Sequence, residues 1–440
     1  MKLCMISLGC DKNLVDSEMM LGFLNRGTVS ITDDAESADI IIVNTCCFIL
    51  DAKDESIQTI LDAARLKQEG KLKLLIMSGC MAERYKDEIM REIPEIDAVV
   101  GTSSYDKIGE VIEQALAGER VEEFQDLNRL PAVSEKRLFS TLHAYAYLKI
   151  AEGCDKHCSY CIIPSLRGHF RSYPMETLVA QAEQMAAAGV KELILVAQET
   201  TVYGQDIYKK KKLPSLLRKL CRIKGIRWIR ILYCYPEEIT DELIACMAKE
   251  KKICRYLDLP IQHASDPILR RMGRRTSRQD LLNIIEKLRT AMPDITLRTT
   301  LISGFPGETE EDHQTLMDFV SEVRFDRLGV FPYSREEGTA AAKFPAQVPA
   351  RTKKKRRNQL MALQQKISAE KLQMRVGECM TALVEGYLPD EGVYIGRSYM
   401  DAPDVDGYLF FSSERELISG EFVRVRITEA SEYDLKGVMV

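Results

Sequence analysis

The stretch that decides the fold is "YLKIAEGCDKHCSYCIIP", residues 147–164, where an apolar run leads directly into three closely spaced cysteines. The run at residues 147–153 has the length and apolar content of a buried β-strand. Cys154, Cys158 and Cys161, here called the loop triad, follow it with gaps of three and two residues. In α/β domains, functional loops lie at the carboxyl ends of the strands. The stretch therefore predicts a functional loop at the end of a buried strand.

The alternation of strand and helix continues after this loop. Further candidate strands are "ELILVAQE", "WIRILYCYP", "YLDLPI", "TLRTTLISGFPG" and "RLGVFPYS", and helical stretches long enough to cross over separate them. Six such strand–helix units predict a barrel or partial barrel, which we place at residues 142–374.

The first hundred residues show the same alternation. The runs "KLCMISLGC", "DIIIVNTC" and "KLLIMSGC" are typical of buried strands, and each precedes a helical stretch, which predicts a parallel sheet at residues 1–117. Each run ends in a cysteine, and Cys10, Cys46 and Cys80 are here called the amino-terminal triad. Because the carboxyl ends of parallel strands meet at one edge, we expect these three thiols to converge.

Two further segments complete the domain organisation. Residues 118–141 have mixed charge and weak periodicity and are predicted to be a linker. Residues 375–440 change to short alternating runs separated by Gly, Asp and Pro, which predicts a small all-β domain. The expected fold is thus an α/β protein with an amino-terminal parallel domain, a central barrel-like domain and a carboxyl-terminal β domain.

Composition excludes several classes of protein. The 440 residues carry a formal net charge of −5, so no overall basic field attracts nucleic acid. No segment approaches the roughly 20 apolar residues that span a bilayer, and the start of the chain is more typical of a strand than of a signal peptide. The 13 cysteines are therefore expected in reducing cytoplasm, where clustered thiols serve metal binding or catalysis.

The loop triad favours a cubane iron–sulfur cluster over zinc. Structural zinc takes four ligands, commonly as two pairs of cysteines, and this loop supplies three. His157 lies inside the loop, where it would be strained as a fourth tetrahedral ligand. A cubane has four iron corners, so three thiolates leave one corner free to bind another molecule. A zinc loop or a chance grouping is the alternative.

The CxxxCxxC spacing of the loop triad resembles that of the radical S-adenosylmethionine (SAM) enzymes. The resemblance implies that the open iron of a 4Fe–4S cluster chelates SAM and that the reduced cluster cleaves SAM to a 5′-deoxyadenosyl radical. It also implies SAM-binding roles for residues that would otherwise be interpreted as solvated strand ends and a tight loop. These are Tyr160 beside the adenine, Gln198 and Glu199 at the amino group, and Gly304 and Gly307 where backbone approaches the nucleoside.

The amino-terminal triad adds a second resemblance, to the methylthiotransferases among the radical SAM enzymes. It implies an auxiliary 4Fe–4S cluster with an open iron, used for sulfur insertion, whereas a redox-sensing or zinc triad is the alternative. The likeness covers almost the whole chain and identifies the tail as a TRAM-like domain. Cys47 is kept as a spare thiol next to Cys46. The other cysteines are interpreted as small buried hydrophobes: Cys4, Cys221, Cys234, Cys246, Cys254 and Cys379.

Within that family the chain is most similar to the RimO branch, through "SLGCDKNLVDSEMMLG" and "YLDLPIQHAS", although Asp11 stands where proline is usual. The resemblance implies an enzyme that uses two SAM molecules to methylthiolate the β-carbon of an aspartate in small-subunit ribosomal protein twelve. It also implies an electron donor such as flavodoxin or ferredoxin. The alternatives are a tRNA adenosine methylthiotransferase and, among non-enzymes, an iron–sulfur scaffold or carrier.

The charge of the tail bears on the partner. From Arg375 onward the chain has six basic and thirteen acidic residues, a net charge of −7. Such a domain would repel nucleic acid and attract a basic polypeptide, which argues against tRNA binding; an ordinary solvated surface is the alternative. We predict that Asp404 and Asp406 contribute to this recognition. The basic run from Lys353 to Arg357 is predicted to be a solvated helix start, with contact to ribosomal RNA as the alternative.

Overall fold

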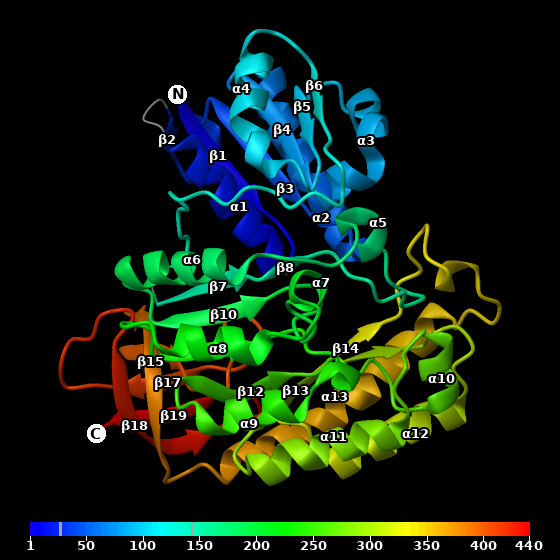
Figure 1. Cartoon of the computed structure of the whole chain (residues 1–440), viewed down its shortest axis with the longest axis vertical. Helices are drawn as coiled ribbons and strands as arrows, with labels where there is room; N and C mark the ends of the chain where they lie inside the picture. The colour runs from blue at the N-terminus through cyan, green and yellow to red at the C-terminus, as the bar shows by residue number, and fades with distance from the viewer. Residues whose placement is uncertain (26–28, 142–143) are drawn as a thin grey trace.

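The computed structural model describes residues 1–25, 29–141 and 144–440. Three domains follow one another along the chain: an α/β domain, a larger α/β domain and a small β-barrel (Figure 1). The first domain lies at the top of the view and the barrel at the lower left, and both contact the central domain. The fold class predicted from the sequence is confirmed.

A parallel six-stranded sheet forms the first domain. Its elements are β1 (Lys2–Ser7), α1 (Asp11–Leu24), β2 (Ser30–Ile31), η1 (Ala35–Ser37), β3 (Ile40–Thr45), α2 (Leu50–Gln68), β4 (Leu74–Gly79), α3 (Cys80–Glu92), β5 (Ala98–Val100), η2 (Tyr105–Lys107), α4 (Ile108–Leu116) and β6 (Val121–Glu123). The strand order is β2-β1-β3-β4-β5-β6. Every residue of β3 and β4 is buried, because α1 and α4 cover one face of the sheet and α2 and α3 cover the other.

The predicted linker at residues 118–141 is partly a strand. β6 lies within it and pairs in parallel with β5, so the first sheet extends to Glu123 and the linker begins later than predicted. A three-residue edge strand is too short to produce a periodic pattern, which explains the difference. Further along, the buried Arg137 side chain binds α1 through Glu18, with an Nε to Oε2 distance of 2.9 Å.

The central domain contains the six predicted strands in one parallel sheet. Its elements are β7 (Tyr145–Lys149), β8 (Ala151–Glu152), α5 (Ile163–Arg167), β9 (Arg171–Ser172), α6 (Met175–Ala187), β10 (Glu192–Val196), α7 (Gln205–Tyr208), α8 (Leu213–Cys221), β11 (Trp228–Ile231), η3 (Pro236–Glu238), α9 (Asp241–Lys249), β12 (Ile253–Asp258), α10 (Asp266–Arg271), α11 (Arg278–Ala291), β13 (Thr296–Ser303), α12 (Glu310–Val323), β14 (Arg327–Pro332), η4 (Ala341–Lys343) and α13 (Ala350–Gln373). The strand order β7-β10-β11-β12-β13-β14 follows the sequence, and β7 and β14 are the two edges. The sheet is therefore a partial barrel rather than a closed one. Among the helices of the described segments, none combines the length and apolar content needed to cross a bilayer.

The tail forms a closed five-stranded barrel. Its strands are β15 (Cys379–Leu388), β16 (Val393–Arg397), β17 (Leu409–Ser412), β18 (Phe422–Ala430) and β19 (Leu435–Met439), in the order β15-β16-β17-β19-β18. Alternate residues of β18 point into a small apolar core that includes Val423, Val425 and Ile427. The predicted small all-β domain is confirmed.

Buried ion pairs dock this barrel on the amino-terminal ends of the central strands. Glu192, the first residue of β10, accepts from Arg230 Nε at 2.7 Å and from Arg397 Nη2 at 2.8 Å, and all three side chains are fully buried. Burial alone would raise the pKa of Glu192, but the two guanidiniums lower it below its ordinary value. Arg327, the first residue of β14, pairs in the same way with Asp401 of the β16–β17 loop.

We expect Glu192→Ala to destabilise the protein strongly, because it leaves the buried Arg230 guanidinium without its counter-ion and leaves Arg397 with Glu385 alone. Breaking a buried ion pair by removing one partner costs about 3–5 kcal/mol. Urea denaturation of the variant measures this cost. Glu176→Ala is the matched control, because Glu176 pairs with Lys219 at the surface and should contribute little. Equal, small effects of the two changes would contradict the prediction.

Candidate functional site

The amino-terminal triad lies at the carboxyl edge of the first sheet. Cys10 is the residue that caps the start of α1, Cys46 follows β3, and Cys80 is the first residue of α3. The register of β1, β3 and β4 brings their ends level. Burial raises the pKa of Cys46 to about 12, and the nearby thiols of Cys80 and Cys10 contribute to the rise. The three cysteines therefore lie at one edge of the sheet.

Cys46 is held by its neighbours on two sides. Its backbone N–H donates to Ser56 Oγ at 3.1 Å, and that hydroxyl donates back to the Cys46 carbonyl at 2.8 Å. Gly9 lies against Cys46 with a φ of 87°, and a Cβ on Gly9 would stand 2.5 Å from Cys46 Cβ. A side chain at Gly9 would thus displace Cys46. Cys47 packs into the apolar core with Met81, which favours Cys46 as the member of the triad.

Asn13, in the first turn of α1, ties the three cysteine loops together. Its Nδ2 donates to the carbonyls of Leu8 and Thr45, at 3.0 and 2.9 Å, and so joins the loops after β1 and β3. Its Oδ1 lies 3.9 Å from Cys80 Sγ, at the start of α3 directly after β4. This role was not predicted, and its one signal in the sequence is the position of Asn13 one turn after Cys10.

The loop triad lies between β8 and α5, beyond the carboxyl end of β7. Burial raises the pKa of Cys154 and of Cys161 to about 12, and the Cys158 thiol contributes to both shifts. The three thiols are therefore close together. Cys158 Sγ also lies 3.5 Å from Tyr235 Oη. His157 is exposed, as expected for a loop residue that is not a ligand.

Each triad supplies three thiols, the donor set of a cubane cluster with one open corner. Thiolates bound to one zinc ion at about 2.3 Å would lie within about 4 Å of one another. Within residues 1–25, 29–141 and 144–440, no three Cys, His, Asp or Glu side chains are gathered in a way that could hold one ion. Cubane thiolates bind at separate iron corners and are spaced more widely. The buried thiols with a raised pKa would lose their protons on binding such a cluster; these are Cys46, Cys80, Cys154 and Cys161.

The aromatic residue predicted to lie beside the SAM adenine packs against the glycine-rich turn. The Tyr160 ring meets Phe305 edge-on, with the ring centroids 6.4 Å apart. Phe305 lies in the turn at residues 304–307, whose backbone is fastened by Glu308: its Oε2 accepts from the N–H groups of Gly304 at 2.6 Å and Phe305 at 3.0 Å. The structure therefore brings these two predicted SAM-binding elements together.

Backbone conformation and packing both favour the two glycines in this turn. Gly304 and Gly307 have φ values of 70° and 84°, which strongly favour glycine. The space that a Cβ would fill is occupied by the protein itself, by Lys353 at Gly304 and by Arg271 at Gly307. The turn and the internal packing therefore require glycine at both positions, and the approach of this backbone to a nucleoside stays a prediction.

Gln198 and Glu199 follow β10 and carry acceptors that the protein does not use. Gln198 Oε1 and Glu199 Oε2 are buried, and no group in the described part of the chain donates to either. The other carboxylate oxygen of Glu199 accepts from the Thr201 N–H at 2.8 Å. Burial raises the pKa of Glu199 to about 7. Two unused acceptors near the loop triad suit a ligand with N–H donors, in agreement with the predicted role.

Two buried side chains beside Cys158 were not predicted from the sequence. The Arg274 guanidinium stacks over the Tyr235 ring, 4.1 Å from its centroid. Its Nε and Nη1 are buried and have no hydrogen-bond partner among the described residues. Unpaired guanidinium donors next to a thiol site are suited to an anionic ligand group. The surrounding sequence "RMGRRTS" does not distinguish Arg274 from the arginines next to it. Only the packing of Arg274 in the folded chain distinguishes it.

Asp406 is not available for recognition, and that prediction is wrong. Its carboxylate accepts from Tyr256 Oη at 2.7 Å and lies 3.5 Å from Arg298 Nε, with 3% of the side chain exposed. Asp406 therefore joins the barrel to the central domain. Asp404 is exposed and accepts from Tyr145 Oη at 3.1 Å. Counting charges could not separate surface carboxylates from those buried at a domain contact.

The basic run from Lys353 to Arg357 is only partly a solvated helix start. Arg356 is buried and binds Glu308 Oε1 at 3.0 Å, which supports the glycine-rich turn. Lys353 Nζ donates to the Tyr333 carbonyl at 2.8 Å. Two of the five basic residues therefore serve internal packing rather than the surface.

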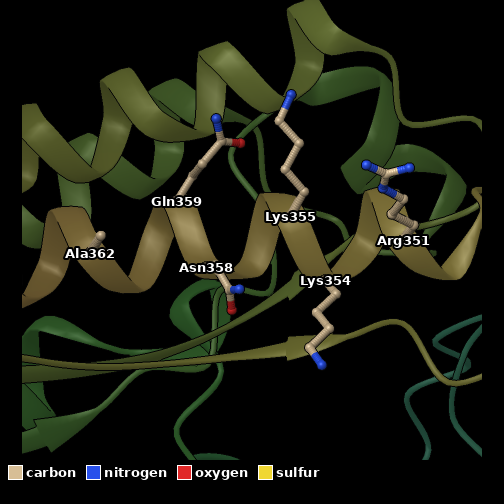
Figure 2. A pocket seen from close by; sticks show the side chains of 6 residues that line it. All are labelled: Arg351, Lys354, Lys355, Asn358, Gln359 and Ala362. Carbon is tan, nitrogen blue, oxygen red and sulfur yellow. The ribbon is translucent and has the colours of Figure 1, made fainter.

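The exposed part of this run borders a shallow hollow on α13. Figure 2 shows Arg351 and Lys355 extending to one side of the helix and Lys354 to the other. The remaining lining residues are Asn358, Gln359 and Ala362, and no cysteine of either triad lines the hollow. The hollow is a basic surface separate from the thiol sites.

Three family models match the chain in the order of its domains. Residues 2–101 match a family described as Uncharacterized protein family UPF0004, residues 148–320 match the Radical SAM superfamily, and residues 376–440 match the TRAM domain. These matches correspond to the first sheet, the central sheet and the closing barrel.

Several curated proteins are similar to the chain over their whole length. A protein of Lachnoclostridium phytofermentans named ribosomal protein uS12 methylthiotransferase RimO is 59% identical, with 99% of each chain covered. Proteins of the same name from Acetivibrio thermocellus and Pelotomaculum thermopropionicum are 50% and 52% identical; each match covers 100% of this chain, with 98% and 99% of the relative.

Solved structures share the fold at much lower identity. The radical S-adenosylmethionine methyltransferase TsrM from Kitasatospora setae has a TM-score of 0.56 at 14% identity, covering 77% of this chain and 73% of its own. The cobalamin-dependent radical enzyme OxsB has a TM-score of 0.53 at 14% identity, covering 84% of this chain and 56% of its own. At such identity the likeness shows the fold alone.

We expect Glu199→Gln to reduce the pH dependence of stability. The pKa of Glu199 is about 7 in the folded chain against an ordinary 4.5, so between these values the folded state binds more protons than the unfolded state. Stability therefore falls as the pH rises through this window, by on the order of 3 kcal/mol when complete. Glutamine removes this loss. Thermal unfolding should be measured at about pH 5 and about pH 8. The stability of the variant relative to the wild-type protein should be greater at the higher pH. Parallel pH profiles would contradict the assignment.

Proposed function

Because the chain belongs to the RimO family of radical SAM methylthiotransferases, we propose that it inserts sulfur and a methyl group into ribosomal protein uS12. The modified position is the β-carbon of an aspartate. Each turnover consumes two SAM molecules: one yields the radical that removes a hydrogen from that carbon, and the other donates the methyl group to sulfur.

The observation that carries the proposal is the placement of two thiol triads on either side of one buried domain contact. The loop triad ends where α5 begins, and Arg167 at the end of α5 lies 3.7 Å from Cys80 Sγ of the amino-terminal triad. We propose that each triad holds one 4Fe–4S cluster through its three thiolates. When bound, the cluster at the loop triad supplies the electron that cleaves SAM, and the auxiliary cluster supplies an open iron for sulfur.

The chain's own residues bind and orient SAM. The free acceptors of Gln198 and Glu199 receive its N–H groups, and the unpaired donors of Arg274 bind its carboxylate. Tyr160 packs beside the adenine, in the apolar cluster that includes Phe305. Each of these side chains is fixed by burial or by a neighbour, which holds the ligand in one orientation.

The acidic barrel recognises the basic substrate protein. Six exposed carboxylates of the carboxyl-terminal domain have no ion-pair partner among the described residues: Asp390, Glu391, Asp404, Glu414, Glu416 and Glu432. This surface favours a cationic polypeptide and disfavours the phosphates of tRNA. A ribosomal substrate places the reaction in the cytoplasm, where a one-electron carrier such as flavodoxin or ferredoxin is the electron donor.

Mass spectrometry of cells that lack this gene tests the substrate. Ribosomal protein uS12 should lose an increment equal to one sulfur atom plus one CH₂ group, and tRNA from the same cells should be unchanged. Complementation with the wild-type gene should restore the increment, and complementation with Cys154→Ala should not. Loss of a methylthio group from tRNA in place of uS12 would overturn the proposal.

The two triads should have separable roles. The reconstituted wild-type protein should contain about eight irons, and replacing either triad by alanine should leave about four. Without the amino-terminal triad, sulfur insertion should stop while cleavage of SAM to 5′-deoxyadenosine continues; without the loop triad, both should stop. Cys47→Ala is the matched control and should keep about eight irons. A wild-type protein with about four irons, or with zinc, would contradict the two-cluster assignment.

A further inference from the structure

Arg167 connects the two thiol sites through one buried side chain. It ends α5, the helix that follows the loop triad, and its side chain reaches α1 of the first domain. Its Nη1 donates to Asp16 Oδ2 at 2.6 Å, and its Nη2 donates to Asn13 Oδ1 at 2.6 Å. The same Nη2 lies 3.7 Å from Cys80 Sγ, within hydrogen-bond distance for sulfur. One guanidinium thus binds the first domain and contacts a thiol of its triad.

The geometry of this guanidinium is fixed by a closed set of buried charges. Asp16 and Glu152 supply two carboxylates, and Lys149 binds both of them. Glu152 Oε2 also lies 3.6 Å from Arg167 Nη1. No more than 5% of any of these four side chains is exposed. The two carboxylates and the two cations pair with one another in the interior and hold the Arg167 side chain in place. Its contact with Cys80 is therefore a fixed part of the site.

We infer that Arg167 is a positioning residue that donates a hydrogen bond to the Cys80 thiolate and raises the reduction potential of the auxiliary cluster. The inference rests on the proposed function, because it takes the amino-terminal triad to hold that cluster. A hydrogen bond to a ligating sulfur and a nearby positive charge both stabilise the reduced cluster. The buried position of the guanidinium makes both effects larger than they would be in water.

A purely structural role for Arg167 predicts a different result. If the guanidinium only joined the two domains, its loss would lower stability without changing the potential of a cluster that is still bound. Arg137 provides the comparison, because it is buried, binds Glu18 of the same helix α1 and makes no contact with a cysteine in the described structure. The potential of the auxiliary cluster is therefore the readout that separates the two roles.

The test compares Arg167→Gln, Arg167→Lys and the control Arg137→Gln in the full chain. Potentiometric titration followed by electron paramagnetic resonance measures both clusters. In Arg167→Gln we expect the auxiliary cluster to shift to a more negative potential while the radical cluster is unchanged. Arg167→Lys keeps the positive charge but loses the planar, two-pronged donor geometry of the guanidinium. It should therefore shift the potential of the auxiliary cluster less than Arg167→Gln does. Arg137→Gln should leave both potentials as in the wild type. Unshifted potentials in an Arg167 variant that holds about eight irons would overturn the inference.

A second measurement on the native side chain covers the case in which the variants do not fold. Protein labelled with ¹⁵N-arginine, and carrying alanines at the loop triad, retains the auxiliary cluster as its source of signal. Pulsed resonance should detect a ¹⁵N coupling from Arg167 to the reduced cluster, and Arg137→Gln should retain it. Absence of this coupling would overturn the inference. If this protein instead failed to bind about four irons, the auxiliary cluster of the proposed function would be refuted.

Discussion

The buried guanidinium of Arg167 is the contact on which both thiol sites depend. A buried charge needs partners of opposite sign. The carboxylates that pair with Arg167 come from α1 of the first domain and from the strand next to the loop triad. Satisfying the charge therefore fixes how the two domains meet. Asn13 accepts a hydrogen bond from the same guanidinium and also joins the loops after β1 and β3. The placement of the amino-terminal triad therefore depends on the domain contact.

At the opposite end of the central sheet, buried ion pairs dock the barrel on the central domain. Glu192, Arg230 and Arg397 are fully buried where the barrel meets the amino-terminal ends of the strands. The loop triad lies beyond the carboxyl ends, as in other α/β folds. The loop triad and the docked barrel therefore occupy opposite ends of one sheet.

Much of the site could be predicted from local pattern. The loop triad is one short stretch, and the amino-terminal triad follows from three strands that each end in a cysteine. Arg274 and Arg167 could not be predicted in this way, because each is one arginine among many and acquires its role from partners distant in the chain. Gly304 was predicted to bring backbone close to the nucleoside, but the pattern gave no sign that Lys353 of α13 packs against this glycine.

The sequence by itself determined the parallel sheets, their order and the convergence of the cysteines, because strand periodicity and strand ends are local properties that topology carries to one edge. Only the tertiary structure decided which of Cys46 and Cys47 meets the Gly9 loop and that Asp406 lies inside a domain contact. Both decisions concern burial. Burial depends on which distant residues pack against a side chain, and neither charge counts nor spacing along the chain contain that information.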